Sequence, residues 1–308
     1  MPSASSTRAC ARASRGTESD DRRDPADATQ HVSPRLKGAR RSRTLAIGIA
    51  FVGLIVAVAL ISLVWLPYEP SDTSGGRLEA PSWEHWLGTD KFGRDLVTQL
   101  MIGARIAITV GCGAVAVGAA IGITVGLIAA FAKPWLDDTI SATLDVLIAF
   151  PVLLLAMLIV AAQGASLGTA ILAIGIALSA VVARLTRILA SQVLRAQYVT
   201  AARTSGTRVF GIIGQHVLPN IWPTLGVNLA LLFGAAVLAE ASLSYLGLGA
   251  PPPNASWGRM LQEAQATFTT APAGAIAPGI ALVILVVGVN FIADGLRDLA
   301  DPTRKRSR

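Results

Sequence analysis

Charged residues are scarce in this sequence, at 15% of 308 residues, whereas a soluble domain carries about 25%. The charges that are present crowd into residues 1–43 and 297–308, and long stretches between these ends contain none. Hydrophobic residues, by contrast, reach 53%. This balance argues against a soluble globular protein and predicts an all-α, polytopic membrane protein with both ends in water.

Cysteine and lysine are also rare. The two cysteines, Cys10 and Cys112, are too few for a disulfide framework or a metal cluster, so no metal site is expected. A phosphate-binding loop needs a glycine followed by lysine and then serine or threonine. The lysines stand at positions 37, 91, 133 and 305, and none follows a glycine. We therefore expect the chain to bind no cofactor of its own, to have no catalytic residues and not to hydrolyse ATP itself.

The net charge of +7 raises the possibility of a nucleic-acid partner. Much of the excess lies in residues 1–43, directly before an apolar segment, and this placement follows the positive-inside rule without any such partner. Basic residues beside a membrane also attract anionic lipid headgroups. Membrane lipid, and no nucleic acid, is therefore the expected partner. Because residues 1–43 lack apolar periodicity, they are predicted to form a disordered basic cytoplasmic tail.

About six apolar segments are long enough to cross the roughly 30 Å hydrocarbon core as helices, with five or seven as the alternatives. Residues 44–103 are predicted to hold the first transmembrane helix, ending before Pro67, and then a polar extracytoplasmic segment. The remaining spans are predicted at about 104–131, 139–162, 169–189, 222–246 and 274–296. Pro151 is expected to kink the third span.

The charges between the spans predict the orientation in the cell membrane. The 67–103 segment carries more acidic than basic residues, whereas the tails and the connection at 190–220 are basic. By the positive-inside rule, the N-terminus, the 190–220 loop and the basic C-terminal segment 299–308 are cytoplasmic.

The 190–220 loop is longer than an ordinary helix–helix connection. Its first part is predicted to be a short helix that ends at Gly206. Val209, Ile212 and Ile213 then recur at helical spacing on one face, and Leu218-Pro219 is expected to end this second helix before the fifth span. Periodicity alone favours two interpretations equally: a surface element that docks into a groove on a partner, or an interfacial helix on lipid.

Two acidic residues within the spans are candidates for lining a pore or vestibule, because buried acids in a membrane are costly and often functional. Asp145 lies near the cytoplasmic end of the third span and is expected either to pair with Arg184 or Arg187 or to serve transport. Glu240 lies near the outer end of the fifth span and is expected either to face a substrate vestibule or to cap the turn that follows.

Part of the 190–220 loop resembles the conserved cytoplasmic loop of ABC importer permeases, a Glu-Ala-Ala motif followed by a glycine and an apolar-x-Leu-Pro ending. Ala201-Ala202, Gly206 and Leu218-Pro219 fall in register. Thr200 stands where that motif has its glutamate. His216 occupies the motif's apolar position, as in the peptide-type subgroup.

Four further stretches resemble blocks of one subgroup of this family. They are residues 85–95 (HWLGTDKFGRD), 239–249 (AEASLSYLGLG), 252–258 (PPNASWG) and 294–302 (DGLRDLADP). In this order and spacing the chain resembles, over about residues 44–303, the C-type permease subunit of the dipeptide/oligopeptide/nickel ABC importers. The resemblance implies the type I permease fold, with residues 104–298 as the core permease domain.

The resemblance also implies a role and partners. The chain would be the transport subunit, not an enzyme, of a binding-protein-dependent importer for di- or oligopeptides or a similar small solute such as a nickel chelate, opine or glycoside. Its partners would be a B-type permease, two ATPase subunits that use ATP and Mg²⁺, and an extracytoplasmic solute-binding protein. The implied docking residues in the 190–220 loop are Tyr198, Thr200, Ala201, Ala202, Arg203, Gly206, Ile212, His216, Leu218 and Pro219.

Two alternative functions remain. One is an ion-coupled secondary transporter, which needs charges near the membrane midplane, and the other is a membrane anchor for a cytoplasmic enzyme.

Overall fold

The computed structural model describes residues 34–251 and 254–300 of the chain. By its internal contacts the chain divides into residues 1–38 and 39–308, and the account below concerns the second unit. Most of the predicted N-terminal tail, and residues 301–308 of the predicted C-terminal segment, lie outside the described residues.

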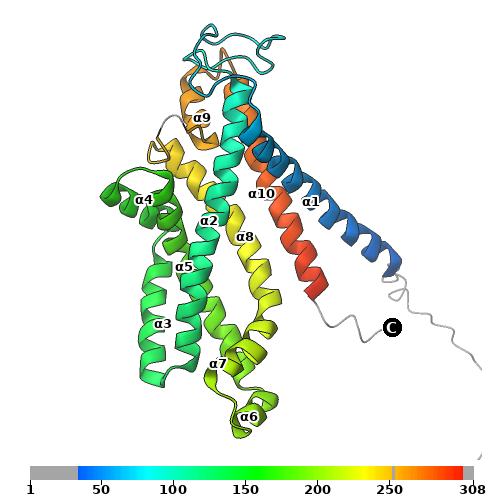
Figure 1. Cartoon of the computed structure of the whole chain (residues 1–308), viewed down its shortest axis with the longest axis vertical. Helices are drawn as coiled ribbons and strands as arrows, with labels where there is room; N and C mark the ends of the chain where they lie inside the picture. The colour runs from blue at the N-terminus through cyan, green and yellow to red at the C-terminus, as the bar shows by residue number, and fades with distance from the viewer. Residues whose placement is uncertain (1–33, 252–253, 301–308) are drawn as a thin grey trace, which may run out of the picture. The chain divides into compact units, whose positions relative to one another are not determined.

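Helices account for the regular structure of the described residues, apart from one isolated bridge between Thr89 and Asp95, so the all-α prediction is confirmed (Figure 1). In order they are α1 (Pro34–Val64), α2 (Leu96–Phe131), α3 (Pro134–Ala149), α4 (Val152–Gln163), α5 (Leu167–Leu194), α6 (Gln197–Thr204), α7 (Val209–Ile212), α8 (Leu218–Tyr245), α9 (Trp257–Ala264) and α10 (Ala273–Ala300). A π-helical turn, Ile213–Val217, joins α7 to α8, and a 3₁₀ turn, Gln265–Thr267, follows α9.

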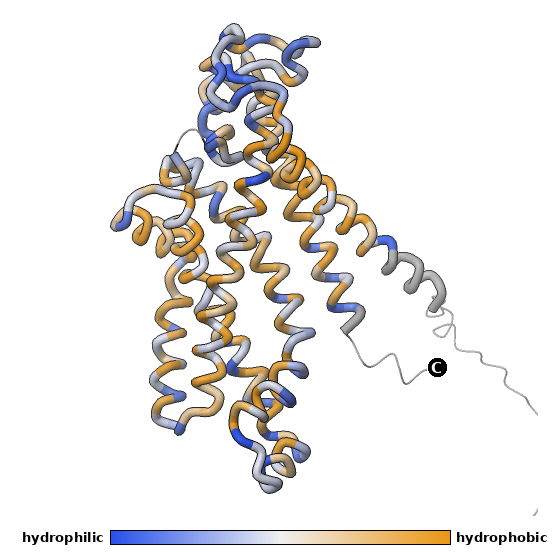
Figure 2. The backbone as a smooth tube through the Cα atoms, in the orientation of Figure 1, coloured by the Kyte–Doolittle hydropathy of each residue, from blue (hydrophilic) through white to orange (hydrophobic). Residues whose placement is uncertain are grey.

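Five of these segments are long and apolar enough to cross a membrane: Arg43–Val64, Leu96–Phe131, Leu167–Leu194, Val209–Tyr245 and Ala273–Asp298. The pair α3 and α4 makes a sixth if it is counted as one broken span. Figure 2 shows apolar residues along these helices and hydrophilic residues gathered toward both ends of the bundle. This distribution matches the multi-pass membrane protein that the composition predicts.

Two helices begin earlier than predicted. Helix α1 starts at Pro34, so the helix already includes the last part of the tail that was expected to be disordered. Proline suits the first helical position, and the Arg, Lys, Leu and Ala residues that follow are good helix formers even where they do not lie in lipid. Helix α2 starts at Leu96 because Asp95 caps it, accepting a hydrogen bond from the backbone N–H of Thr98.

The predicted kink at Pro151 is a sharp break, and the single third span is replaced by two helices. Helices α3 and α4 meet at an angle of 88°. Phe150 and Pro151 both adopt extended backbone conformations, with ψ of 130° and 129°. The residue before a proline is sterically disfavoured from the α region, and the proline itself lacks an N–H donor, so the helix stops here and restarts.

Small residues allow the closest helix pair, α2 with α5, to approach at backbone distance. A Cβ atom on Gly122 would lie 2.5 Å from the Cβ of Val182, and one on Gly126 would lie 2.5 Å from the carbonyl oxygen of Ala183. Lipid offers no hydrophobic drive for helix association, so close packing of this kind supplies the contact energy instead.

The bundle has two distinct ends. We call the end that carries residues 67–95 and α9 the cap end, and the end that carries residues 195–217 the loop end (Figure 1). Helices α8 and α10 pack together in the half nearer the cap end, where Val237 of α8 and Leu285 of α10 are fully buried in one cluster. Trp257, at the start of α9, is 1% exposed and belongs to the same cluster, so it is a core residue.

Candidate functional site

The loop end is built around helix α6, which stops as the sequence predicts. Gly206 adopts φ of +83°, in the left-handed region that glycine occupies without strain. The N–H of Gly206 donates to the carbonyl of Arg203, and the N–H of Thr207 donates to the carbonyl of Ala202. This pair of hydrogen bonds is a Schellman motif, and it turns the chain sharply into α7.

The expected helix stop at Leu218-Pro219 is wrong, because α8 begins at Leu218 and α7 runs into it through the π-helical turn. Pro219 lies in the first turn of α8, a position where its missing N–H is tolerated. A π-helical turn adds a residue to one turn of helix and is frequently found at functional sites. The second helix of the loop and the fifth span are therefore one continuous helical element.

A buried apolar cluster fixes residues 197–217, which we call the loop element, to the ends of three long helices. Val199, Ile212 and Val217 are 0%, 2% and 0% exposed, and they pack with Ala190 of α5 and Ile221 of α8. Leu127 and Phe131 at the end of α2 pack against the same cluster. The loop element is therefore anchored to α2, α5 and α8.

The outer surface of the loop element is exposed and partly apolar. The exposed fractions are 88% for Phe210, 51% for Val209 and 48% for Tyr198. Val209 therefore does not share the buried face of Ile212, as its spacing had suggested. Phe210 was not predicted as a docking residue. Its spacing from Ile212 and Ile213 places it on a different face of the helix, and this spacing could have identified it as an exposed aromatic residue. An exposed aromatic side chain at this position can contact either a partner protein or the lipid surface.

The other predicted docking residues lie around this surface. Tyr198 and His216 face each other with ring centroids 5.9 Å apart, which ties α6 to the π-helical turn. Thr200, Ala201, Arg203, Gly206 and Pro219 are exposed, Ala202, His216 and Leu218 are half-buried, and Ile212 is buried. The structure thus brings the ten predicted residues together at one end of the bundle.

Asp145 pairs with Arg184, one of the two partners that its position suggested. Nη2 of Arg184 donates to Oδ1 of Asp145 at 2.5 Å, and the two side chains are 49% and 57% exposed. Arg187, the other suggested partner, instead binds Asp137 through two hydrogen bonds. These two ion pairs join α3 to α5.

Glu240 lies inside the fold at 4% exposure, close to the cap end of α8. Its Oε1 accepts a hydrogen bond from the hydroxyl of Ser244 at 2.6 Å. A carboxylate this deeply buried is stabilised by such donors, so Ser244 and Glu240 act as a pair in the last turns of α8.

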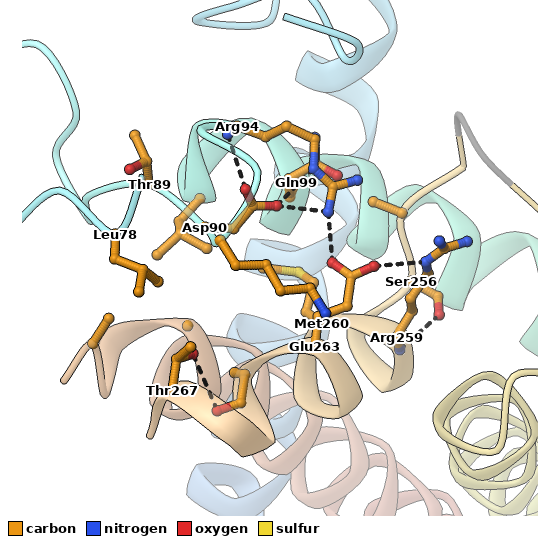
Figure 3. A pocket seen from close by; sticks show the side chains of 16 residues that line it. Leu78, Thr89, Asp90, Arg94, Gln99, Ser256, Arg259, Met260, Glu263 and Thr267 are labelled. Atoms are coloured by element: carbon orange, nitrogen blue, oxygen red, sulfur yellow. Dashed lines mark hydrogen bonds and ion pairs between the residues drawn. The ribbon is translucent and has the colours of Figure 1, made fainter. Parts of the chain in front are cut away.

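A charged network at the cap end was not predicted from the sequence (Figure 3). Nη2 of Arg94 lies 2.6 Å from Asp90 and 2.5 Å from Glu263, and Nε of Arg259 lies 2.9 Å from the other oxygen of Glu263. The network joins the 67–95 segment to α9, two parts of the chain that are far apart in sequence. It borders a pocket of about 30 Å³, which has room for ordered water but not for a solute.

Comparison with known proteins places the chain in a family. Residues 122–306 match the model of the binding-protein-dependent transport system inner membrane component. The chain is 36% identical over 285 residues to the dipeptide transport system permease protein DppC of Alkalihalophilus pseudofirmus, covering 91% of this chain and 94% of that protein. It is 38% identical over 257 residues to the glutathione transport system permease protein GsiD of Pectobacterium atrosepticum, covering 83% of this chain and 85% of that protein.

Proposed function

The chain belongs to the family of binding-protein-dependent transport system inner membrane components, and from this membership we propose that it couples ATP hydrolysis by partner subunits to the import of short peptides. Members of the family are permease subunits of ABC importers, so the chain is a transport component and not an enzyme.

The observation that carries the proposal is the loop element itself. It exposes Phe210 at 88% while Ile212 and Val217, only a few residues away, are buried against the bundle. A surface built in this way can seat in a cleft of an ATPase subunit, with Phe210 as the apolar anchor. Because α7 continues into α8, closure of two ATPases on ATP would tilt α8 and switch the permease between its two open states.

Thr200 bears on the chemistry of this contact. The position is exposed on α6 and carries a hydroxyl where the family motif has a carboxylate. Docking in this chain therefore rests on shape and apolar contact, together with the exposed guanidinium of Arg203, rather than on a negative charge at position 200.

The proposed assembly contains a second, B-type permease, two ATPase subunits that use ATP and Mg²⁺, and an extracytoplasmic solute-binding protein. In this arrangement the loop end faces the cytoplasm with both termini, as the positive-inside rule favours, and the cap end meets the binding protein. Short peptides are the proposed solutes because two relatives are permease proteins of dipeptide and glutathione transport systems.

The test is Phe210→Ala in the complex reconstituted in vesicles with its partners, with Trp135→Ala as the matched control. Trp135 is also an aromatic residue near the loop end and is 67% exposed, but it lies on α3 outside the loop element. Loss of a central aromatic anchor costs about 2 kcal/mol or more of binding, so ATP-driven uptake of a dipeptide should fall strongly for Phe210→Ala alone.

Equal uptake by the two variants would overturn the docking role of the loop element. Uptake that follows a proton gradient and resists vanadate would identify an ion-coupled transporter instead. A complex that binds its partners but moves no solute at all would indicate a membrane anchor.

A further inference from the structure

Helices α8 and α10 are in contact near the cap end and separate toward the loop end (Figure 1). In the half where they are close, Val237 and Ala241 of α8 pack with Leu282 and Leu285 of α10. In the other half, the two helices border an open cleft of about 590 Å³. Thr224, Asn228 and Leu231 line it from α8, and Arg297 and Asp298 line it from α10.

Polar side chains follow one face of α8 through the loop-end half. Asn220, Thr224 and Asn228 recur every four residues, which places them on the same side of the helix. The amide of Asn228 donates to the backbone carbonyl of Thr224 at 3.0 Å, which uses only part of its hydrogen-bonding capacity. Beyond them the same face carries Leu231, which is 42% exposed.

Helix α10 carries a similar polar stretch in its loop-end half. Asn290, Asp294 and Arg297 are exposed and lie on one face, at spacings of four and three residues. Nearer the cap end, Ile280 and Val283 continue this face with apolar side chains that are 54% and 61% exposed. Polar and charged groups in a spanning helix are costly against lipid tails, so these two polar faces require water or a polar solute beside them.

We infer that this cleft is a water-filled vestibule that holds a small zwitterionic solute, with the guanidinium of Arg297 binding its carboxylate and the Asn228 amide binding its peptide group. This inference rests on the proposed transport function and names the surface on which the solute lies. Arginine presents a planar pair of donors that matches a carboxylate, and an amide side chain can both donate to and accept from a peptide bond.

The lining of the cleft favours a solute over the alternative occupants. A lipid tail would leave without water the hydroxyl of Thr224 and the donor and acceptor capacity of Asn228 that its bond to the Thr224 carbonyl does not use. A lipid headgroup would be drawn to a uniformly basic site, whereas Arg297 and Asp298 present both signs of charge. The cleft also borders the half of α8 that continues from the loop element. A displacement of the loop element therefore changes the width of the cleft.

Thiol labelling of Asn228→Cys tests whether the cleft holds water, in a background where Cys10 and Cys112 are alanine. The matched control is Leu54→Cys, because Leu54 is 55% exposed on the apolar helix α1. A positively charged methanethiosulfonate reagent does not enter hydrocarbon. In the purified nucleotide-free complex we expect it to modify Cys at position 228 about tenfold faster or more than Cys at position 54, since only a hydrated thiol ionises readily.

The class of solute is tested by protection of Leu231→Cys in the same background, because Leu231 lines the same cleft, is 42% exposed and leaves Asn228 in place. The dipeptide Ala-Ala should slow modification at position 231 severalfold more than its C-terminal amide, and Arg297→Gln should abolish this difference whereas Arg297→Lys retains part of it. Equal protection by the two compounds, or none, would overturn the assigned chemistry, and a reaction at position 228 as slow as at position 54 would overturn the vestibule.

Labelling needs no transport, so this test is separable from the proposed function. If wild-type vesicles take up dipeptide with ATP and position 228 stays unreactive, the vestibule alone is wrong. If position 228 is reactive and position 231 is protected while uptake ignores ATP, the proposed coupling is wrong.

Discussion

At position 206 the backbone takes φ of +83°, and an added Cβ atom would meet no other heavy atom within 4 Å. A side chain therefore fits in space but strains the backbone. We expect Gly206→Val to cost about 1–2 kcal/mol in the local structure, because a β-branched residue is poorly tolerated in the left-handed region. The Schellman turn should open, and stimulation of the ATPase by the permease should fall while insertion into the membrane is unchanged.

The control for this variant is Gly214→Val. Gly214 lies in the same loop element and also has open space around its Cβ position, but its backbone is not in the left-handed region. ATPase stimulation measured on both variants separates backbone strain from added bulk. Normal stimulation by Gly206→Val would show that the turn at position 206 does not matter for coupling.

Glu263 lies between two guanidinium groups, with a side chain that is 10% exposed. Glu263→Gln removes the negative charge and leaves Arg94 and Arg259 facing each other. We expect the substitution to cost about 1–3 kcal/mol, as for loss of a largely buried, charge-assisted partner, and to lower the unfolding temperature in detergent. Glu69→Gln, a change of the same kind at an exposed residue of the 67–95 segment, should leave that temperature unchanged. Equal temperatures for the two variants would mean that the network adds nothing to stability.

At the scale of the element, the proposed coupling depends on a continuous helix from Phe210 to Tyr245. Gln215 is exposed in the middle of the π-helical turn, so its side chain contributes little packing. Gln215→Pro removes a backbone donor and should cost about 3 kcal/mol or more by breaking the helix, whereas Gln215→Ala should be tolerated. We expect the proline variant to assemble with its partners but to lose ATP-driven dipeptide uptake. Normal uptake by the proline variant would show that coupling does not pass along this helix.

The sequence was informative for elements whose signals are local. Gly206 ended α6 as predicted, because a left-handed turn is a property of one residue and its neighbours. Leu218-Pro219 was misread as a stop, because the same proline fits the first turn of a helix and the π-helical turn before it has no local signature. The angle at Pro151 was also beyond prediction, since a proline permits a break whereas the packing of both flanking helices sets its size.

At the scale of the whole molecule, the network at Arg94 and Glu263 was invisible in the sequence because its members are brought together only by the fold. The cleft between α8 and α10 was missed for the same reason. Hydropathy identified α8 and α10 as spans. Their separation at the loop end, however, depends on where the contacts between them stop. Candidate sites made of one continuous segment were therefore predictable, and sites made of distant segments were not.

The number of membrane crossings is the last property that the fold decides. Helix α5 has 28 residues and is about 42 Å long, so its two ends lie on opposite sides of a membrane. Helix α2 ends at the loop end, and α5 also ends there, so α3 and α4 must carry the chain back toward the cap end despite the 88° bend (Figure 1). We therefore predict that the chain crosses the membrane six times, so that α1 begins and α10 ends on the same side.

A count of six crossings predicts from which side of the membrane a reagent can reach the turn between α4 and α5. In a background with Cys10 and Cys112 replaced by alanine, Ser166→Cys should react with a membrane-impermeant thiol reagent from the same side as Trp83→Cys, which is in the cap segment. Trp135→Cys, at the start of α3, should react only from the opposite side, because α2 separates the two positions. Trp83 and Trp135 are 97% and 67% exposed, so both control positions can react. Reaction of Ser166→Cys from the side of Trp135→Cys would instead show that the bent pair is re-entrant, so that the number of crossings is odd. The two ends of the chain would then lie on opposite sides of the membrane, which contradicts the orientation proposed for the loop end.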